Sequence, residues 1–341
     1  MNYKYKLQPY SGRNSRYTCP KCGKHHEFIL YVDADTNQPL AAHVGMCNRK
    51  DKCGYHYTPS DYFRDNGEIR EIEIVPSRPP VTTHFDVIDE YYLQHYYPNS
   101  NGLQSNHIIH LTSLFGNERV QDMQIEYMTG VYIDGMIIFW QIDLAGKIRT
   151  GKIMQYDPET GHNTGRFNWF HRYLSNPDFI LKQCLYGEHL LKRLDSLKPI
   201  LLVESYKNTH FVRCLTNHFV VVSTDCKGGF TSERCQQLRG RDIIVLPDCG
   251  AFDDWARKAY YISREIGCTM RMSTFLEERA TEAQKDDGYD IADWIQDQII
   301  AGRSLVDIEN ELLVGMQKKN KCHSIYSFFY ILRYYVLNGN P

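Results

Sequence analysis

Residues 200–204 read I-L-L-V-E, and residues 243–248 read I-I-V-L-P-D. Each segment is a short apolar run that ends in an acidic residue, and a third apolar run, residues 219–222, lies between them. Residues with helical spacing follow the first run and the last. Short buried strands that alternate with helices are typical of βαβ units and a parallel sheet. The sequence therefore predicts an α/β module here, within a chain that is α+β overall.

The acidic residues that end two of these runs are Glu204 and Asp248. In a parallel α/β sheet, ligands bind beyond the carboxyl ends of the strands. Two carboxylates from neighbouring strands are suited to Mg²⁺, or Mn²⁺, because such an ion prefers hard oxygen ligands and keeps positions for phosphates. On spacing alone, the alternative is that each acid only caps the helix that follows it.

Upstream of this module, residues 135–157 read GMIIFWQIDLAGKIRTGKIMQYD. Two β-rich runs flank the turn at residues 144–146, which predicts a hairpin. Basic side chains lie on or near the hairpin, and one interpretation is that they form the solvent face of an antiparallel pair. The other interpretation, a grip on a template strand or an incoming triphosphate, is what the family resemblance described below implies. These residues are Lys147, Arg149, Lys152 and Arg166, and Lys152 is the strongest candidate because its strand leads back toward the parallel sheet.

Near the start of the chain, C-P-K-C-G at residues 19–23 and C-N-R-K-D-K-C-G at residues 47–54 form two paired-cysteine motifs. Each pair has the form of a zinc knuckle, with a glycine that lets the backbone turn around the metal. Four thiolates suit a closed, structural Zn²⁺ site. The second pair is more widely spaced than usual, so a neighbouring histidine could replace one thiolate. The predicted ligands are Cys19, Cys22, Cys47 and Cys53, and the possible substitutes are His25, His26, His43 and His56.

Basic and tyrosine side chains surround the paired cysteines. This combination could hold single-stranded nucleic acid by phosphate contacts and base stacking, or it could be a solvated ribbon surface. The basic residues are Arg13, Arg16, Lys21, Lys24, Arg49, Lys50 and Lys52, and the tyrosines are Tyr10, Tyr17, Tyr55 and Tyr57.

The composition of the 341 residues is that of an ordinary globular protein, with 42% hydrophobic and 23% charged residues. The net charge of −2 gives no overall positive field of the kind that would indicate nucleic-acid binding. The opening MNYKYKLQPY lacks the apolar core of a signal peptide, and no run reaches a membrane-spanning length, so we expect a cytoplasmic protein without a membrane partner. In that compartment paired cysteines indicate a metal rather than disulfides.

The chain also resembles a known family. LLVESYKN at residues 201–208, followed by IIVLPDCGAFDDW at residues 243–255, is similar to the toprim domain of bacterial primases, topoisomerases and related nucleases. The hairpin, followed by CLYGEHLL at residues 184–191, resembles the segment that precedes toprim in bacterial-type primases. The order of zinc ribbon, polymerase-like core and toprim matches the primase arrangement. The resemblance is closest to zinc-ribbon and toprim proteins of bacterial mobile elements.

The resemblance assigns roles to the acidic residues. Glu204 corresponds to the toprim glutamate, which would bind metal or act as general acid or base, and Asp248 to the first aspartate of the toprim D-x-D motif. The chain departs from the motif at position 250, which is glycine. Asp253 and Asp254 are the candidate substitutes, and Asp293 resembles a further acidic position. The missing aspartate places full two-metal catalysis in doubt, because two ions must neutralise the attacking and leaving oxygens together.

Two lysines close to these acids, Lys207 and Lys227, are candidate phosphate contacts. The alternative is that both are ordinary surface lysines. The leading hypothesis is therefore a primase-like nucleotidyltransferase that binds single-stranded DNA and nucleoside triphosphates. A non-catalytic DNA-binding accessory protein and a toprim nuclease are the alternatives. No Walker-type phosphate loop occurs in the sequence, so a helicase, if needed, would be a separate chain.

We expect five segments along the chain. They are a zinc ribbon at residues 1–65, a linker and helical segment at 66–130, a primase-core-like segment at 131–197, a toprim-like domain at 198–302 and a helical tail at 303–341.

Overall fold

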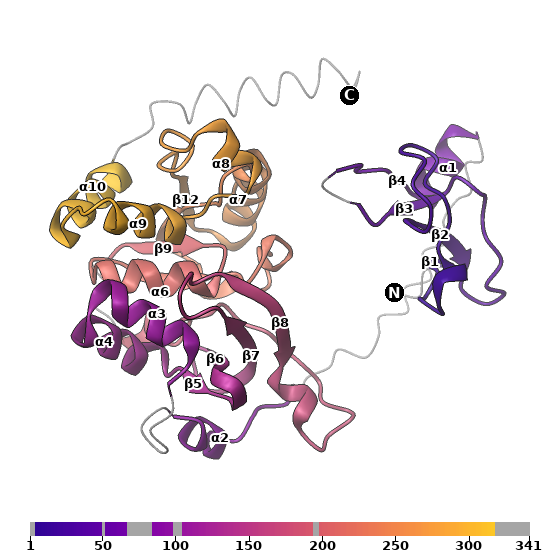
Figure 1. Ribbon diagram of the computed structural model, residues 1–341. Coiled ribbons are helices and arrows are strands. Elements are labelled where there is room, and N and C mark those ends of the chain that lie inside the picture. The colour runs from indigo at the N-terminus through magenta and orange to yellow at the C-terminus, as the bar shows by residue number, and fades with distance from the viewer. Residues whose placement is uncertain (1–3, 50–51, 67–83, 98–103, 194–197, 318–341) are drawn as a thin grey trace. The chain divides into compact units, whose positions relative to one another are not determined.

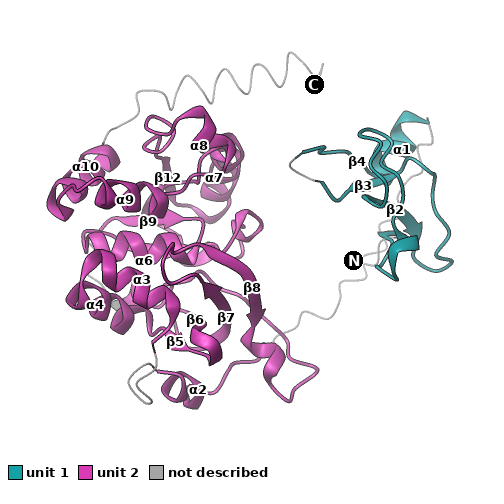
Figure 2. Cartoon of the chain, in the orientation of Figure 1, with its two compact units in different colours: residues 1–83 teal, residues 84–341 magenta. Residues whose placement is uncertain are grey.

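The structure is a computed structural model that describes residues 4–49, 52–66, 84–97, 104–193 and 198–317. The chain forms two compact units, residues 1–83 and residues 84–341 (Figure 2), and each is described by itself. Residues 67–83 and 98–103 of the predicted linker and helical segment, and residues 318–341 of the predicted tail, lie outside the described residues.

Unit 1 is a small antiparallel sheet with one helix. Its strand order is β1-β2-β3-β4, and Phe28 and Leu30 of β2 pack among the cysteines in its core. Thr58 and Asp61 form a capping box at the start of the helix, because each side chain accepts a hydrogen bond from the backbone of the other. The elements are β1 (Tyr5–Leu7), β2 (Phe28–Asp33), β3 (Gly45–Cys47), β4 (His56–Tyr57) and α1 (Pro59–Asp65).

The first half of unit 2 contains an antiparallel sheet of order β5-β6-β7-β8, which includes the predicted hairpin. Strand β6 is buried on both faces: Ile137 and Phe139 contribute to the main core, while Ile138 and Trp140 pack in a second cluster against Phe170. The elements are α2 (Glu90–His95), α3 (Asn106–Phe115), α4 (Asn117–Tyr127), β5 (Gly130–Val131), β6 (Ile137–Ile142), β7 (Ile148–Tyr156) and β8 (Asn163–Trp169).

The second half of unit 2 is the predicted parallel sheet, of order β10-β9-β11-β12. The mixed α/β class predicted from the sequence is therefore confirmed. Helix α6 packs against α3, α4, α9 and α10 (Figure 1). The elements are α5 (Leu190–Arg193), β9 (Ile200–Val203), α6 (Tyr206–Leu215), β10 (Val220–Ser223), β11 (Asp242–Val245), α7 (Phe252–Ile266), β12 (Thr269–Met272), α8 (Glu282–Asp286), α9 (Ile291–Ile300) and α10 (Leu305–Gln317).

The strand order creates a switch point between β9 and β11. The chain leaves β9 toward β10 on one side, whereas it leaves β11 toward β12 on the other. In open α/β sheets, ligands bind beyond the carboxyl ends of strands at such a point. Tyr186 pairs with Ser223 of β10 through backbone hydrogen bonds, which ties the L-Y-G segment to the edge of this sheet.

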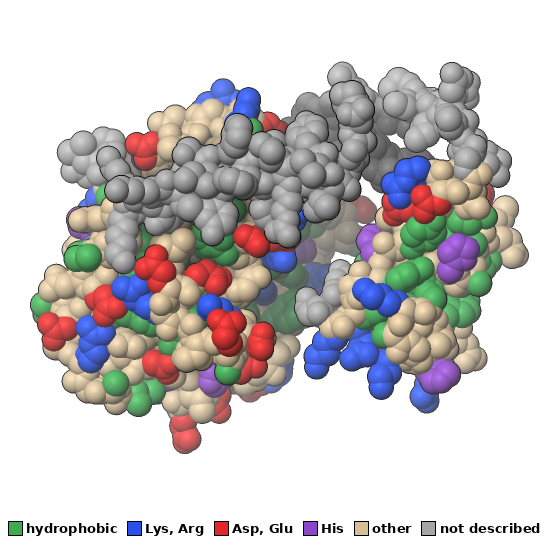
Figure 3. Space-filling model, turned by 90° about the horizontal axis from the view of Figure 1, so that it is seen from above, with side chains coloured by type: hydrophobic (Ala, Val, Ile, Leu, Met, Phe, Trp, Pro, Cys, Tyr) green, Lys and Arg blue, Asp and Glu red, His purple; other side chains and the backbone are tan. Residues whose placement is uncertain are grey.

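The surface of unit 2 carries charges of both signs, intermingled on the face that Figure 3 shows. This mixture agrees with the small net charge of the chain. Among the described residues, no helix combines the length and the apolar character needed to cross a membrane.

Candidate functional site

The paired cysteines of unit 1 converge on one point. The sulfur atoms of Cys19, Cys22, Cys47 and Cys53 all lie within 4.8 Å of one another. Gly23 and Gly54, which follow the two pairs, have φ values of 66° and 63°, a conformation that glycine adopts without strain. Four soft donors at this spacing fit a tetrahedral structural Zn²⁺. Four thiolate ligands would leave the ion no open coordination position for a substrate, so the site would stabilise the fold rather than catalyse a reaction.

The histidines near the ribbon have other partners. His25 Nδ1 lies 2.9 Å from Thr18 Oγ1, and His56 Nε2 lies 3.0 Å from the Tyr31 hydroxyl. The His43 ring packs against Tyr57 and Tyr62. Cys47 and Cys53 both belong to the group despite their wide spacing in sequence, and among the described residues the four thiols alone make it up.

In unit 2, Glu204 and Asp248 follow β9 and β11 at the switch point. Glu204 Oε1 accepts a hydrogen bond of 3.0 Å from the Lys227 backbone amide, and Asp248 Oδ1 accepts one of 2.9 Å from Asn208 Nδ2. Neither acid caps a helix. Ser205 caps α6 with its side chain, and the N-cap of α7 is Ala251, which provides no side-chain cap. The capping alternative is therefore wrong for both carboxylates.

Burial dominates the electrostatics of these two acids. It raises the pKa of Glu204, although the Lys227 amide and the Lys227 and Lys258 charges work in the opposite direction. The pKa of Asp248 is raised well above its usual range by burial, and further by the charges of Asp290 and Glu204. Neighbouring negative charges thus add to the effect of burial on both acids, with Asp290 acting on each of them and Glu204 acting on Asp248.

Asp290 is a member of this group that the sequence analysis did not select. It is buried at the N-cap of α9, where its Oδ1 accepts a hydrogen bond of 2.9 Å from the Asp293 amide. Burial raises the pKa of Asp290. The D-x-x-D spacing of residues 290–293 could have pointed to Asp290. An acid at the first position of this pattern is typical of a helix N-cap, where the start of the helix holds it in place. Of the two, Asp290 is the more deeply buried, whereas Asp293 is the residue that the resemblance selected.

Lys207 is not a surface lysine. Its Nζ lies 2.9 Å from Asp290 Oδ2 and 2.9 Å from Asp293 Oδ1, and its side chain is only 16% exposed. Burial alone would lower the pKa of Lys207, but the two carboxylates outweigh it and raise the pKa. The ammonium is therefore a fixed positive charge in the acidic site, the name used here for the group Glu204, Asp248, Asp290 and Asp293.

Lys152 joins the hairpin to the parallel sheet. Its Nζ lies 2.6 Å from Oδ1 of Asp225, which follows β10, and both side chains are largely buried. The ammonium also lies over the rings of Trp169 and Tyr206, at 5.6 Å and 5.7 Å from their centroids. The hairpin thus delivers a cation to the carboxyl-end edge of the parallel sheet, where the acids lie.

The loop after β10 and the start of α7 place the remaining candidates. Lys227 Nζ pairs with Asp254 at 2.7 Å and is half exposed. Asp253 is exposed on the first turn of α7. Gly250 has a φ of 77°, and its amide donates to Glu277 Oε1 at 3.1 Å. Of the two possible substitutes for the missing aspartate, Asp254 is the one connected to Glu204. It pairs with the Lys227 side chain, and the Lys227 backbone amide donates to Glu204.

The other basic residues of the hairpin lie at the surface or pair locally. Arg149 pairs with Asp143 at 2.7 Å, Arg166 lies 3.5 Å from Asp134 at an exposed position, and Lys147 is exposed. They are not gathered around Glu204 and Asp248 as Lys152 and Lys207 are.

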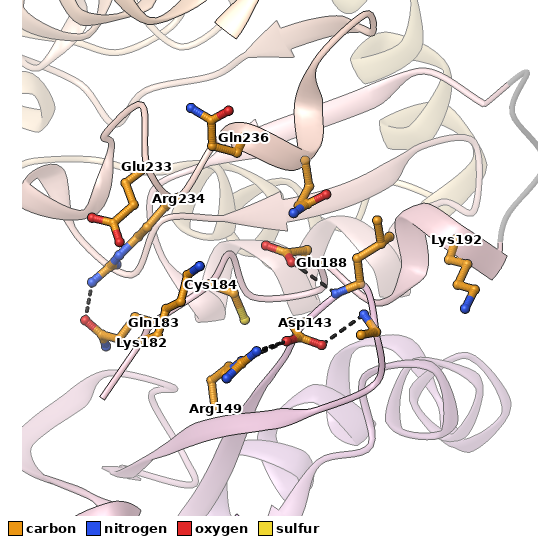
Figure 4. A pocket seen from close by; sticks show the side chains of 13 residues that line it. Asp143, Arg149, Lys182, Gln183, Cys184, Glu188, Lys192, Glu233, Arg234 and Gln236 are labelled. Carbon is orange, nitrogen blue, oxygen red and sulfur yellow. Dashed lines mark hydrogen bonds and ion pairs between the residues drawn. The ribbon is translucent and has the colours of Figure 1, made fainter. Parts of the chain in front are cut away.

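A cavity of about 580 Å³ lies between the hairpin turn and the residues that follow β10. Figure 4 shows Arg149 directed at Asp143 and Arg234 at Gln183, so the two guanidinium groups on its walls already have partners. Glu188 on the same wall accepts hydrogen bonds from the amides of Leu144 and Leu185, yet burial raises its pKa to about 7. Glu204 and Asp248 do not line this cavity.

Two protein-family models match parts of the chain. Residues 105–249 match a domain of unknown function, DUF6371, and residues 3–68 match a zinc beta-ribbon finger family. The second match spans all four clustered cysteines, so unit 1 is a zinc ribbon with a structural Zn²⁺ site. No curated protein matches the chain.

Solved structures of bacterial primases are similar at low sequence identity. The RNA polymerase domain of Mycobacterium tuberculosis primase DnaG is 13% identical, with 70% of this chain and 94% of that chain covered and a TM-score of 0.38. A DnaG primase catalytic domain bound to single-stranded DNA is 15% identical, with 64% and 82% covered and a TM-score of 0.33. The zinc-binding and RNA polymerase domains of Aquifex aeolicus primase are 10% identical, with 74% and 67% covered and a TM-score of 0.31.

Proposed function

We propose that this chain is a primase-like protein that binds single-stranded DNA through its zinc ribbon and transfers nucleotides at a toprim site. The observation that carries the proposal is the pair Glu204 and Asp248. They follow adjacent parallel strands at the switch point of the sheet, and the charge of Glu204 raises the pKa of Asp248. Two partly buried carboxylates at the ends of adjacent parallel strands are suited to a divalent ion and its phosphate ligands.

The roles of the residues follow from their contacts. A bound Mg²⁺ or Mn²⁺ would supply the positive charge that phosphoryl transfer requires. Glu204 and Asp248 would hold that ion, while the Lys227 amide and Asn208 fix the orientation of the two carboxylates. Glu204 would alternatively act as general acid or base, the second role that the resemblance assigns to it.

The basic side chains would bind the substrates. Lys152 and Lys227 lie at the carboxyl-end edge of the sheet, where the phosphates of a nucleoside triphosphate would be. Lys147 and Arg166, which are exposed on the hairpin, would contact the template backbone, and Arg149 would do so if its pairing with Asp143 opens. A partner helicase and a place on a mobile element belong to the same proposal and rest on the resemblance of the sequence.

The ribbon would hold the template through stacking and phosphate contacts. Tyr10 is 70% exposed, and the Arg16 guanidinium lies over its ring at 5.0 Å from the centroid. An exposed aromatic ring beside a guanidinium can stack an unpaired base and pair with its phosphate.

The test is primer synthesis on a single-stranded template with labelled nucleotides and Mg²⁺. We expect Glu204→Gln and Asp248→Asn each to reduce the rate roughly 100-fold or more, because each removes several kcal/mol of transition-state stabilisation through the metal. The matched control is Asp242→Asn, an exposed acid at the opposite, amino end of β11, which should leave the rate unchanged. Primer synthesis that survives both site changes would exclude this active site.

One observation favours a second function, a non-catalytic DNA-binding accessory protein. Position 250 carries no carboxylate, and among the described residues the four cysteines are the only group of three or more potential ligands within 4.8 Å. The same assay separates the alternatives. A chain that binds DNA but neither makes nor cuts it with any divalent ion would support the accessory function, and cleavage without synthesis would support a toprim nuclease.

A further inference from the structure

The carboxylates around the switch point differ in how many of their oxygens are already used. Both oxygens of Asp290 are engaged: Oδ1 accepts from the Asp293 amide at 2.9 Å, and Oδ2 pairs with Lys207 Nζ at 2.9 Å. Both oxygens of Asp293 are engaged as well, because Oδ1 pairs with Lys207 Nζ at 2.9 Å and Oδ2 accepts from the Asp290 amide at 3.1 Å. These two acids therefore form a closed unit with the ammonium.

Glu204 and Asp248 are different. The hydrogen bonds from the Lys227 amide and from Asn208 use Glu204 Oε1 and Asp248 Oδ1, and they leave Oε2 and Oδ2 outside these contacts. Asn208 adds a third oxygen, since it is fully buried and its Oδ1 has no hydrogen-bond partner among the described residues. A buried amide oxygen without a partner is costly, and it is the kind of hard donor that a divalent ion or one of its waters would satisfy.

We propose that the acidic site holds a single divalent cation, at Glu204 and Asp248, and that the Lys207 ammonium takes the place of a second. This inference rests on the proposed function. In two-metal sites, two ions stabilise the attacking and leaving oxygens. Here the chain itself provides the second positive charge, fixed by two carboxylates on the first turn of the neighbouring helix.

The chemistry of the ammonium agrees with this role. Lysine has three N–H donors, and Asp290 and Asp293 accept from two of them, so one donor remains for a phosphate oxygen. Gly250, which offers no carboxylate, fits a site that needs ligands for one ion only.

The experiment is a Mn²⁺ titration of the full chain, with zinc in the ribbon, followed by electron paramagnetic resonance of the free ion. We expect one Mn²⁺ per native chain, and none at this site in a Glu204→Gln and Asp248→Asn double variant. In Lys207→Met, Asp290 and Asp293 lose their internal cation, and we expect a second Mn²⁺ to bind. Lys207→Arg keeps the charge and should still bind one ion.

The outcomes separate the inference from the proposed function. A native chain that binds two Mn²⁺ ions at the acidic site overturns the inference and leaves the proposed function standing. A native chain that binds none removes both. If Lys207→Met is folded by circular dichroism and still binds only one ion, the ammonium is not what excludes the second, and the inference fails. The native stoichiometry decides the first two outcomes even if the variant does not fold.

Discussion

The thiolate site of unit 1 and the acidic site of unit 2 gather ligands in opposite ways. The four sulfur atoms lie within 4.8 Å of one another and come from two short motifs, each closed by a glycine turn. The acids come from separate elements, since Glu204 and Asp248 follow two strands and Asp290 is the N-cap of α9. An internal lysine already pairs with two of the carboxylates in that site.

The difference reflects what each ion requires. A structural Zn²⁺ takes all four ligands from the chain, so the chain must bring all four together. A catalytic Mg²⁺ keeps positions for phosphates and water, so the chain supplies only part of the shell and needs other charges to keep its acids stable. We therefore expect unit 1 to depend on its metal for folding, and unit 2 to depend on its internal ion pairs.

The largest expected effect is loss of the ribbon in Cys47→Ser. Structural Zn²⁺ contributes roughly 10 kcal/mol or more to the folding of such small units. Zinc analysis should find about one ion per native chain and none in the variant, and limited proteolysis should cleave unit 1 while unit 2 resists. His56→Ala, which changes a histidine outside the thiolate group, should keep its zinc. Equal zinc content in Cys47→Ser and the native chain would contradict the four-thiolate site.

The next effect concerns the buried pair Lys152 and Asp225. Lys152→Met leaves the Asp225 carboxylate buried without its partner, so we expect the free energy of unfolding of unit 2 to fall by about 3 kcal/mol or more. Chemical denaturation measures this loss. Lys147→Met, at an exposed position on the same hairpin, should change stability by no more than about 0.5 kcal/mol. Equal stabilities of the two variants would show that the pair does not hold the hairpin against the sheet.

A smaller effect is the pH dependence contributed by Glu188. Its pKa is raised from 4.5 to about 7, so its contribution to stability is complete below pH 4.5 and is lost as the pH rises through about 7. The full difference corresponds to about 3 kcal/mol at most, at 1.4 kcal/mol for each pKa unit. The melting temperature of the native chain should fall between pH 4.5 and pH 8, and that of Glu188→Gln should fall less over the same range. Parallel curves would mean that Glu188 does not titrate in this range.

The smallest effect is that of Arg166→Ala on DNA binding. Arg166 is exposed and its pairing with Asp134 is long, so stability should change by less than about 0.5 kcal/mol. If the side chain contacts one phosphate, the slope of log K against log salt for single-stranded DNA should become shallower by about 0.7. Fluorescence anisotropy at several salt concentrations measures the slope, and an unchanged slope would remove Arg166 from the interface.

Local sequence was enough for the ribbon and for the strands of the parallel sheet. The ligand set of a zinc knuckle is fixed by cysteine and glycine positions a few residues apart, so Cys19, Cys22, Cys47 and Cys53 could be read directly. The apolar runs of residues 200–203 and 243–246 gave two strands for the same reason, because a strand buried on both faces is a continuous apolar segment.

Only the tertiary structure decided which charges meet at the acidic site. Lys207 lies more than eighty residues before Asp290 and Asp293 in the sequence, and nothing in its local pattern distinguishes a buried ion-pair partner from a surface lysine. The pairing of Lys152 with Asp225 likewise depends on how the hairpin packs against the end of β10. The sequence by itself thus determined the thiolate ligands and the strand ends that carry Glu204 and Asp248. The packing of α6 and α9 decided that a lysine lies among the acids, because a charge can be buried there only where its counter-charges arrive from another part of the chain.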